Sequence, residues 1–341
     1  MKNYEFQTQE FSTVGDKQLQ HCDVLDSIQN KKKWKPVTFQ LAPTGVCDFN
    51  CSFCSVKNRD KTLSLDFKDI KKALKDFKSL GAKALEITGG GNPLLYPQIN
   101  EVIDYAHKLG YDIGLISNSM NPGKYLTKES AKKLIWYRAS LSAYHNQPSW
   151  EDIKSLSQLG WYDFSVIPEG VLGFSYVINK DTTKEILQNI YELVKSRPDV
   201  KFVRVTPNCL EPDSLNNFKK KWGTIIEKID KSGKFFLKEV VDAHLPYPEF
   251  CAVGMIRPYV CEDGYVYACS SFLLRKRKLE PEWRIGHITD IKGMYRKANE
   301  LYKKTGKPYK VPIDKCFHCL LPGNNKLLHT VCRQMVDKNF A

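Results

Sequence analysis

Residues 37–54 read VTFQLAPTGVCDFNCSFC, a β-type run that leads into a loop rich in cysteine. The apolar, β-branched and aromatic residues of 37–41 predict a buried strand. The loop cysteines, spaced C-x3-C-x2-C, are Cys47, Cys51 and Cys54. Three thiolates on one loop can hold three irons of a [4Fe–4S] cube and leave the fourth iron open to another ligand. Zinc is the alternative, but it requires a fourth nearby ligand, and residues 57–59 offer none.

Downstream of this loop, short β-type runs alternate with amphipathic helical segments. The predicted strands are residues 37–41, 84–88, 113–117, 138–143, 174–178 and 202–206. The predicted helices are residues 67–80, 96–109, 128–135, 183–195 and 215–231. In the first helix, Ile70, Leu74 and Phe77 recur at helical spacing. Regular alternation of this kind is typical of a parallel sheet, and about six βα units predict an α/β fold with a partial (β/α)6 barrel of the TIM type.

The composition changes along the chain and divides it into three predicted regions. Residues 1–36 are polar and form an N-terminal arm, and residues 37–243 form the barrel. Residues 244–341 hold six of the eleven cysteines but too little apolar sequence to build a core of their own. We expect this last region to be a small module held together by a metal ion or an iron–sulfur cluster.

The overall charge and the cysteine content restrict the class of protein. Among 341 residues, 52 Lys and Arg against 38 Asp and Glu give a net charge of +14, which favours anionic partners. Residues 1–30 carry no apolar signal segment, and no apolar run approaches the roughly 20 residues that span a membrane. We therefore expect a cytoplasmic protein without membrane contact, whose cysteines bind metal in a reducing compartment instead of forming disulfides.

The motif C-x3-C-x-aromatic-C after a first strand resembles that of the radical S-adenosylmethionine (SAM) enzymes. The resemblance implies that Cys47, Cys51 and Cys54 are the catalytic ligands of a [4Fe–4S] cluster whose open iron binds the amino and carboxylate groups of SAM. An electron from the cluster would cleave SAM reductively to a 5′-deoxyadenosyl radical, which abstracts hydrogen from a substrate. An external donor such as flavodoxin or ferredoxin would supply that electron. Phe53 would lie beside the adenine of SAM.

A second motif supports this resemblance. Thr88-Gly-Gly-Gly-Asn-Pro93 follows a predicted strand, where the family has a glycine-rich GGE-type loop. The resemblance implies that backbone groups of this loop bind the amino-acid end of SAM, because glycine lets the backbone approach a ligand closely. Asn92 stands where many relatives have Glu, so a carboxylate contact is not expected there. The SAM-binding residues expected in this loop and at later strand ends are Gly89, Gly90, Gly91, Asn92, Ser117, Asn118 and Ser142.

The C-terminal cysteines form a second group. Cys251 and Cys269 are separated by the pattern C-x12-G-x4-C, and Cys316 and Cys319 follow as C-x2-C. Four soft ligands hold zinc or an iron–sulfur cluster equally well on chemistry alone. The pattern also resembles the SPASM extension of radical SAM enzymes in its shortened form, called twitch. This implies one auxiliary [4Fe–4S] cluster on the four cysteines, for electron transfer or substrate docking. Asn325 stands where a full SPASM module would place its next cysteine.

Four further cysteines lie outside both groups. We expect Cys22, Cys209, Cys261 and Cys332 to be ordinary buried cysteines, which behave as small apolar residues. Two alternatives stay open: Cys261 or Cys332 could replace one of the auxiliary ligands, and Cys209 could face the cavity of the barrel.

The sequence leaves the substrate open, but the charge orders the hypotheses. The main hypothesis is a nucleotide, a modified nucleobase or another anionic small molecule, with DNA or RNA as a variant. It rests on the net charge of +14 and on cation-rich clusters at residues 219–222, 275–278 and 303–310, which could track phosphates and stack bases. The alternative is that these clusters are ordinary solvated surfaces. A peptide- or protein-modifying enzyme of the SPASM type is the alternative. A zinc-stapled, non-enzymatic protein that binds nucleic acid is a remote alternative.

Overall fold

The computed structural model describes residues 15–141, 163–237, 248–270, 280–316 and 319–333, and the structural statements below concern these residues. Their strands form one sheet in the order β10-β9-β8-β1-β2-β3-β4-β5-β6-β7. The strands from β8 to β7 along this order are parallel, whereas β9 and β10 are antiparallel to their neighbours. Strand bounds are β1 Thr38–Leu41, β2 Ala84–Ile87, β3 Asp112–Ser117, β4 Leu134–Ser140, β5 Leu172–Ile178, β6 Phe202–Pro207, β7 Phe235–Leu237, β8 Tyr259–Val260, β9 Tyr265–Tyr267 and β10 Arg284–His287.

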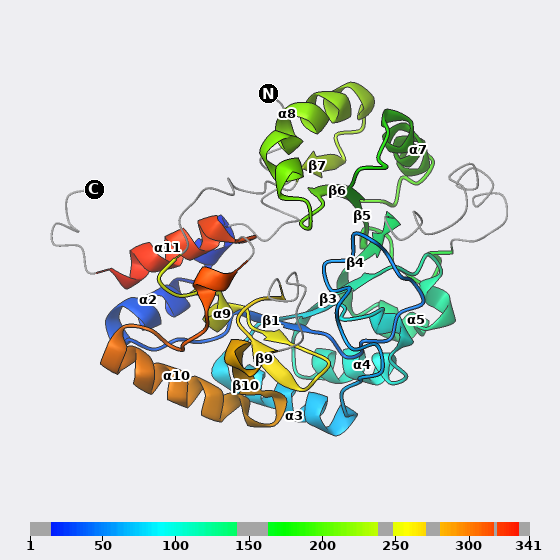
Figure 1. Ribbon diagram of the computed structural model, residues 1–341. Coiled ribbons are helices and arrows are strands. Elements are labelled where there is room, and N and C mark those ends of the chain that lie inside the picture. The colour runs from blue at the N-terminus through cyan, green and yellow to red at the C-terminus, as the bar shows by residue number, and fades with distance from the viewer. Residues whose placement is uncertain (1–14, 142–162, 238–247, 271–279, 317–318, 334–341) are drawn as a thin grey trace.

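Helices connect the parallel strands, as the pattern of the sequence predicts. The helices are α2 Cys22–Lys31, α3 Phe67–Leu80, α4 Ile99–Lys108, α5 Lys128–Ala131, α7 Lys184–Lys195, α8 Pro212–Ile229, α9 Val253–Ile256, α10 Ile291–Thr305 and α11 Pro322–Cys332. A 3-10 helix, η1 Gly15–Gln20, precedes them. Figure 1 shows α3, α4 and α5 on the outer side of the strands. The predicted α/β fold with a partial barrel is confirmed.

Helix α3 shows why the sequence adopts this fold locally. The Asp66 side chain accepts a hydrogen bond from the Lys68 N–H and caps the first turn, and Gly81 ends the helix in the left-handed region with φ of 106°. Ile70 and Phe77 are fully buried against the sheet. Burial of each such side chain contributes about 1.5–3 kcal/mol, so the helix is held by its apolar face.

The two faces of the sheet have different chemistry. Phe39, Leu85 and Tyr137 are buried on the helix-covered side, where they belong to the main hydrophobic core. Their neighbours along the strands point the other way, because strand side chains alternate. Gln40 and Glu86 are paired in register across β1 and β2, and both line the interior cavity. The inner face of the barrel is therefore polar and charged.

Two boundaries differ from the prediction. Residues 134 and 135 belong to β4, not to the preceding helix, which ends at Ala131. Burial alternates along β4, and its β-branched and aromatic residues favour a strand. Helix α4 begins at Ile99, three residues later than expected, because Pro93–Leu95 form a separate 3-10 turn.

Segments from both ends of the chain pack onto the barrel. Strand β8 pairs with β1 in parallel, so residues after 248 extend the barrel sheet. At the N-terminal side, the Trp34 side chain is buried and its ring contacts the Tyr302 ring edge-on. The backbone N–H of Trp34 donates to Asn299 Oδ1 at 2.7 Å. The predicted boundary between residues 243 and 244 and the cation-rich cluster at residues 275–278 lie outside the described residues. No helix in the described part of the chain is long and apolar enough to cross a membrane.

Candidate active site

The first cysteine group lies in the loop that follows β1. An antiparallel bridge between Thr44 and Ser64 closes the base of this loop. The Cys54 N–H donates to the Cys51 carbonyl at 3.1 Å in a tight turn. Burial raises the pKa of the Cys47 thiol, and the nearby Cys54 raises it further. The loop therefore places Cys51 and Cys54 in one turn near Cys47, and the role of the three cysteines as cluster ligands remains a prediction.

Arg59 holds this loop from inside, a role that its sequence position did not reveal. The side chain is buried, its Nε donates to the Gly45 carbonyl at 2.9 Å, and its Nη1 lies 3.6 Å from Cys54 Sγ. The guanidinium lowers the pKa of Cys47, against the effect of burial. A fixed cation beside the thiols favours their anionic form, which is the form that binds metal.

The glycine loop after β2 packs directly on the cysteine loop. The Gly91 N–H donates to the Thr44 carbonyl and the Asn92 N–H to the Val46 carbonyl, both at 2.8 Å. A Cβ atom at Gly91 would overlap the Val46 carbonyl oxygen. Glycine is therefore required at position 91 because the two loops pack closely there. This reason differs from the expected one, which was close approach of the backbone to SAM. SAM contact by this loop remains a prediction.

Several predicted ligand residues meet in a small polar cluster beside these loops. Ser117 Oγ donates to Asn92 Oδ1 at 2.8 Å, and Asn118 Nδ2 donates to Asp48 Oδ1 at 2.8 Å. Asn92 Nδ2 lies 3.4 Å from the same carboxylate oxygen. Asp48 was missed by sequence reasoning, although it directly follows Cys47. Ser142 lies outside the described residues, and Phe53 is partly exposed next to Cys54.

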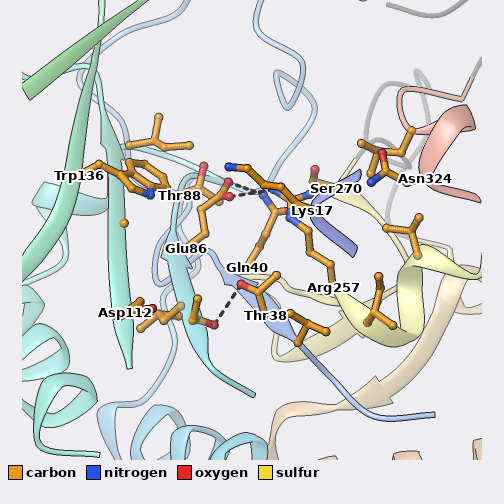
Figure 2. A pocket seen from close by; sticks show the side chains of 18 of the residues that line it. Lys17, Thr38, Gln40, Glu86, Thr88, Asp112, Trp136, Arg257, Ser270 and Asn324 are labelled. Carbon is orange, nitrogen blue, oxygen red and sulfur yellow. Dashed lines mark hydrogen bonds and ion pairs between the residues drawn. The ribbon is translucent and has the colours of Figure 1, made fainter. Parts of the chain in front are cut away.

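A cavity of about 740 Å³ occupies the interior of the barrel (Figure 2). Ser55 and Thr88 line it and connect it to the cysteine loop and the glycine loop. Cys269 lines it on the other side, so the cavity also reaches the second cysteine group. The cavity therefore extends from Ser55, the residue after Cys54, to Cys269 of the second group.

The cavity wall carries a buried ion pair. Glu86 accepts hydrogen bonds from Arg257 Nη2 at 2.8 Å and from Gln40 Nε2 at 2.7 Å, and the three side chains converge in Figure 2. Burial acts to raise the pKa of Glu86, but Arg257 and Arg138 outweigh it and hold the pKa at about 2. Glu86 is therefore ionised at neutral pH.

Two further arginines reach the same interior from β4 and β6. Burial lowers the pKa of Arg138 to about 10, although Glu86 opposes the shift. Burial, with Arg138 nearby, lowers the pKa of Arg204 well below its usual value. Three arginines thus face one buried carboxylate, an arrangement that sequence reasoning did not foresee.

The second cysteine group surrounds a smaller cavity of about 60 Å³. Its sulfur donors are Cys251, Cys269, Cys316 and Cys319. Burial raises the pKa of Cys251, and its neighbours Cys269, Cys319 and Cys316 raise it further, as expected for thiols held close together. Asn325 Nδ2 lies 3.7 Å from Cys319 Sγ and 3.9 Å from Cys251 Sγ. Within the described ranges, no group of three or more His, Cys, Asp or Glu is placed to hold a single metal ion.

The remaining cysteines lie apart from both groups. Cys261 is fully buried in a small apolar cluster with Tyr259 and Tyr267, and its thiol donates to Glu262 Oε2 at 3.2 Å. The expectation of a buried cysteine is thus confirmed for Cys261. Cys332 packs partly buried against the main core, Cys209 is partly exposed, and Cys22, contrary to the expectation, is exposed.

Comparisons with known proteins bear on this arrangement. Residues 41–206 match the Radical SAM superfamily. The fold resembles SuiB of Streptococcus suis bound to precursor peptide SuiA, with 14% identity, a TM-score of 0.52, and coverage of 88% of this chain and 81% of that chain. It also resembles SuiB bound to S-adenosylmethionine, with 13% identity, a TM-score of 0.50, and coverage of 83% and 71%.

A third structure extends the comparison. Native anSMEcpe with bound AdoMet and Kp18Cys peptide shares 12% identity, with a TM-score of 0.53 and coverage of 90% of this chain and 86% of that chain. At these identities the structures support the fold alone. The superfamily match begins at the last residue of β1 and includes the cysteine loop, the glycine loop, the strands β2 to β5 and all but the last residue of β6. Residues 41–206, slightly less than half of the chain, therefore match the Radical SAM superfamily, and this match includes the cysteine loop.

Proposed function

We propose that this chain cleaves SAM reductively at the cysteine loop and abstracts hydrogen from a substrate in the barrel cavity. A reduced [4Fe–4S] cluster bound there would pass one electron to SAM, whose C–S bond would break to give methionine and a 5′-deoxyadenosyl radical that takes a hydrogen atom from the substrate. The electron comes from an external donor of the flavodoxin or ferredoxin class. The observation that carries this proposal is the cysteine loop at the edge of the cavity, inside the superfamily match.

The described side chains have complementary roles in this proposal. Cys47, Cys51 and Cys54 hold the cluster, and the Arg59 guanidinium lies beside Cys54 Sγ and lowers the pKa of Cys47 against the larger effect of burial. The polar cluster around Asp48 suits the amino-acid end of SAM, because its carboxylate can accept hydrogen bonds from an amino group. Asn118 Oδ1 is a buried acceptor without a hydrogen-bond partner in the described part of the chain. Gly89, Gly90, Gly91, Asn92, Ser117, Phe53 and Ser142 complete the proposed SAM site.

We propose one auxiliary [4Fe–4S] cluster on Cys251, Cys269, Cys316 and Cys319, within a C-terminal unit of residues 244–341. Four cysteine sulfurs line one small cavity, and thiolates are the ligands that hold a [4Fe–4S] cluster. Asn325 would donate hydrogen bonds to two of its sulfurs. Cys269 borders the substrate cavity as well, which suits electron transfer between cluster and substrate.

For the substrate we propose a peptide or protein segment. The similarity to SuiB with peptide SuiA and to anSMEcpe with a bound peptide supports this class. An anionic small molecule such as a nucleotide is the second candidate, and the excess of arginine in the cavity favours it.

Anaerobic reconstitution, with iron analysis and assay of 5′-deoxyadenosine after reduction with SAM, tests this proposal. The wild type should bind about eight irons, two cubes' worth, and form 5′-deoxyadenosine. Cys54→Ala should abolish that product, and Cys316→Ala should lose about four irons. Cys22→Ala is the matched control, because Cys22 is exposed at the start of α2. Iron-loaded wild type that leaves SAM intact would refute the proposed function.

A further inference from the structure

The interior of the barrel carries more positive charge than its own carboxylates neutralise. The described cations lining the cavity are Lys17, Lys83, Arg138, Arg204 and Arg257, against the carboxylates of Glu86 and Asp112. Lys83 has a partner away from the arginines, Asp23 at 3.6 Å, and Asp112 is exposed at the start of β3. The buried part of the wall is thus left with one carboxylate and three guanidinium groups.

That carboxylate is already engaged. Glu86 binds Arg257 at 2.8 Å, and the side chains of the pair are only 17% and 14% exposed. Since one carboxylate faces three guanidinium groups, Glu86 offsets only part of their positive charge. The Nε atoms of Arg138 and Arg204 are buried and have no hydrogen-bond partner in the described ranges. Burying a charged donor without a hydrogen-bond partner costs free energy, so these two arginines lower the stability of the folded chain.

The space beside the two arginines is shaped by aromatic rings. Trp136 and Phe202 each lie two residues before an arginine of the same strand and so share its face of the sheet. The rings cover Gly114 on β3 and Gly173 on β5, where any Cβ atom would overlap them. The rings therefore pack closely against the neighbouring strands, and the Arg138 guanidinium lies over the Trp136 ring, 5.6 Å from its centroid.

We infer that Arg138 and Arg204 form the binding site for an oxyanion of the substrate, either a carboxylate or a phosphate. The inference rests on the proposed function, because it places the substrate in the cavity that borders the cysteine loop. A guanidinium fork matches two oxygens of such a group. An oxyanion between the two cations also removes their mutual repulsion, which is strong in a low-dielectric interior. An acidic peptide side chain and a nucleotide phosphate both supply this chemistry.

Anion binding to the reconstituted protein tests the site. Isothermal titration and thermal unfolding would use inorganic phosphate in one arm and the peptide Glu-Glu-Glu, with Gln-Gln-Gln as its neutral control, in the other. Chloride keeps the ionic strength constant throughout. In Arg138→Gln and Arg204→Gln, we expect binding about tenfold or more weaker than in the wild type. Arg197→Gln is the matched control, because it removes the same charge from a pair with Asp199 that does not line the cavity.

The two arms distinguish the sources of the oxyanion. Binding of phosphate alone identifies a phosphorylated small molecule, and binding of the acidic peptide alone identifies a peptide carboxylate. Without any anion, Arg204→Gln should melt at a higher temperature than the wild type, because it removes a buried charge that Glu86 offsets only in part. If Arg138→Gln fails to fold, Arg138→Lys keeps the charge but loses the fork and should bind with intermediate affinity.

Two outcomes would overturn the inference. If all the variants bound the anions with the affinity of the wild type, the two arginines would not form the binding site. Any effect of the anions would then be one of ionic strength alone. Weaker binding of SAM itself in Arg138→Gln and Arg204→Gln, with unchanged affinity for phosphate and for the acidic peptide, would assign the arginines to the carboxylate of SAM. Formation of 5′-deoxyadenosine by the wild type, measured in parallel, separates failure of this site from failure of the proposed function.

Discussion

The ion pair of Glu86 in the cavity wall makes a quantitative prediction about stability. The pKa of Glu86 falls from 4.5 to about 2 on folding, chiefly because Arg257 and Arg138 outweigh the effect of burial. At about 1.4 kcal/mol for each pH unit, the ionised carboxylate contributes about 3 kcal/mol to folding at pH 7. Because the folded pKa is the lower one, this contribution is complete above about pH 5 and is lost as the pH falls toward 2.

Glu86→Gln mimics the protonated carboxyl and keeps a polar group beside Gln40. Its free energy of unfolding should lie about 3 kcal/mol below that of the wild type at pH 7 and only about 1.4 kcal/mol below it at pH 3. The measurement is urea unfolding under anaerobic conditions at both values of pH. Glu300→Gln, on the exposed side of α10, is the control and should change stability by less than about 0.5 kcal/mol. If Glu86→Gln lowered the free energy of unfolding by the same amount at pH 7 and at pH 3, the reasoning would be refuted.

Three more predictions concern the loops and the N-terminal packing. Gly91→Ala should force the two loops apart at the Val46 carbonyl and lower iron content after reconstitution, whereas Gly323→Ala, with open space around its Cα, should bind iron as the wild type does. Arg59→Gln should make the reduction potential of the first cluster more negative, because a cation beside Cys54 Sγ is lost; an unchanged potential in a redox titration followed by EPR would contradict this. Trp34→Ala should destabilise the chain by about 3–5 kcal/mol in urea unfolding, since a fully buried ring is removed; a loss below about 1 kcal/mol would show that the arm is dispensable.

Local patterns in the sequence were sufficient to predict the fold. The apolar spacing of Ile70, Leu74 and Phe77 identifies a helix that the structure contains, and the β-type runs identify β1 to β6. These signals depend on residues within one element. The boundary at Leu134 was wrong because a short apolar run is compatible with either a helix or a strand, and only burial along the strand distinguishes them.

The chemistry of the cavity could not be read in the same way. Cysteine spacing predicts each sulfur group, because the ligands are neighbours in the chain. Glu86, Arg138 and Arg257, in contrast, belong to segments far apart in the sequence, and their meeting depends on sheet order and on which face each residue takes. The sequence excludes Arg59 as a zinc ligand but indicates no other role for it. Nothing in the local sequence shows that its side chain folds back onto Cys54.

The pairing of β1 with β8 has a consequence for how the protein is made. Strand β1 leads into the cysteine loop, and its second edge pairs with Tyr259 and Val260, which leave the ribosome long after Leu41. Glu262, which lies against Gly90, arrives with the same late segment. During synthesis the nascent barrel therefore exposes an unpaired strand edge beside the cysteines, and such long-range pairing is slow to form. We expect the finished chain, not the growing one, to be the form that accepts iron and sulfide.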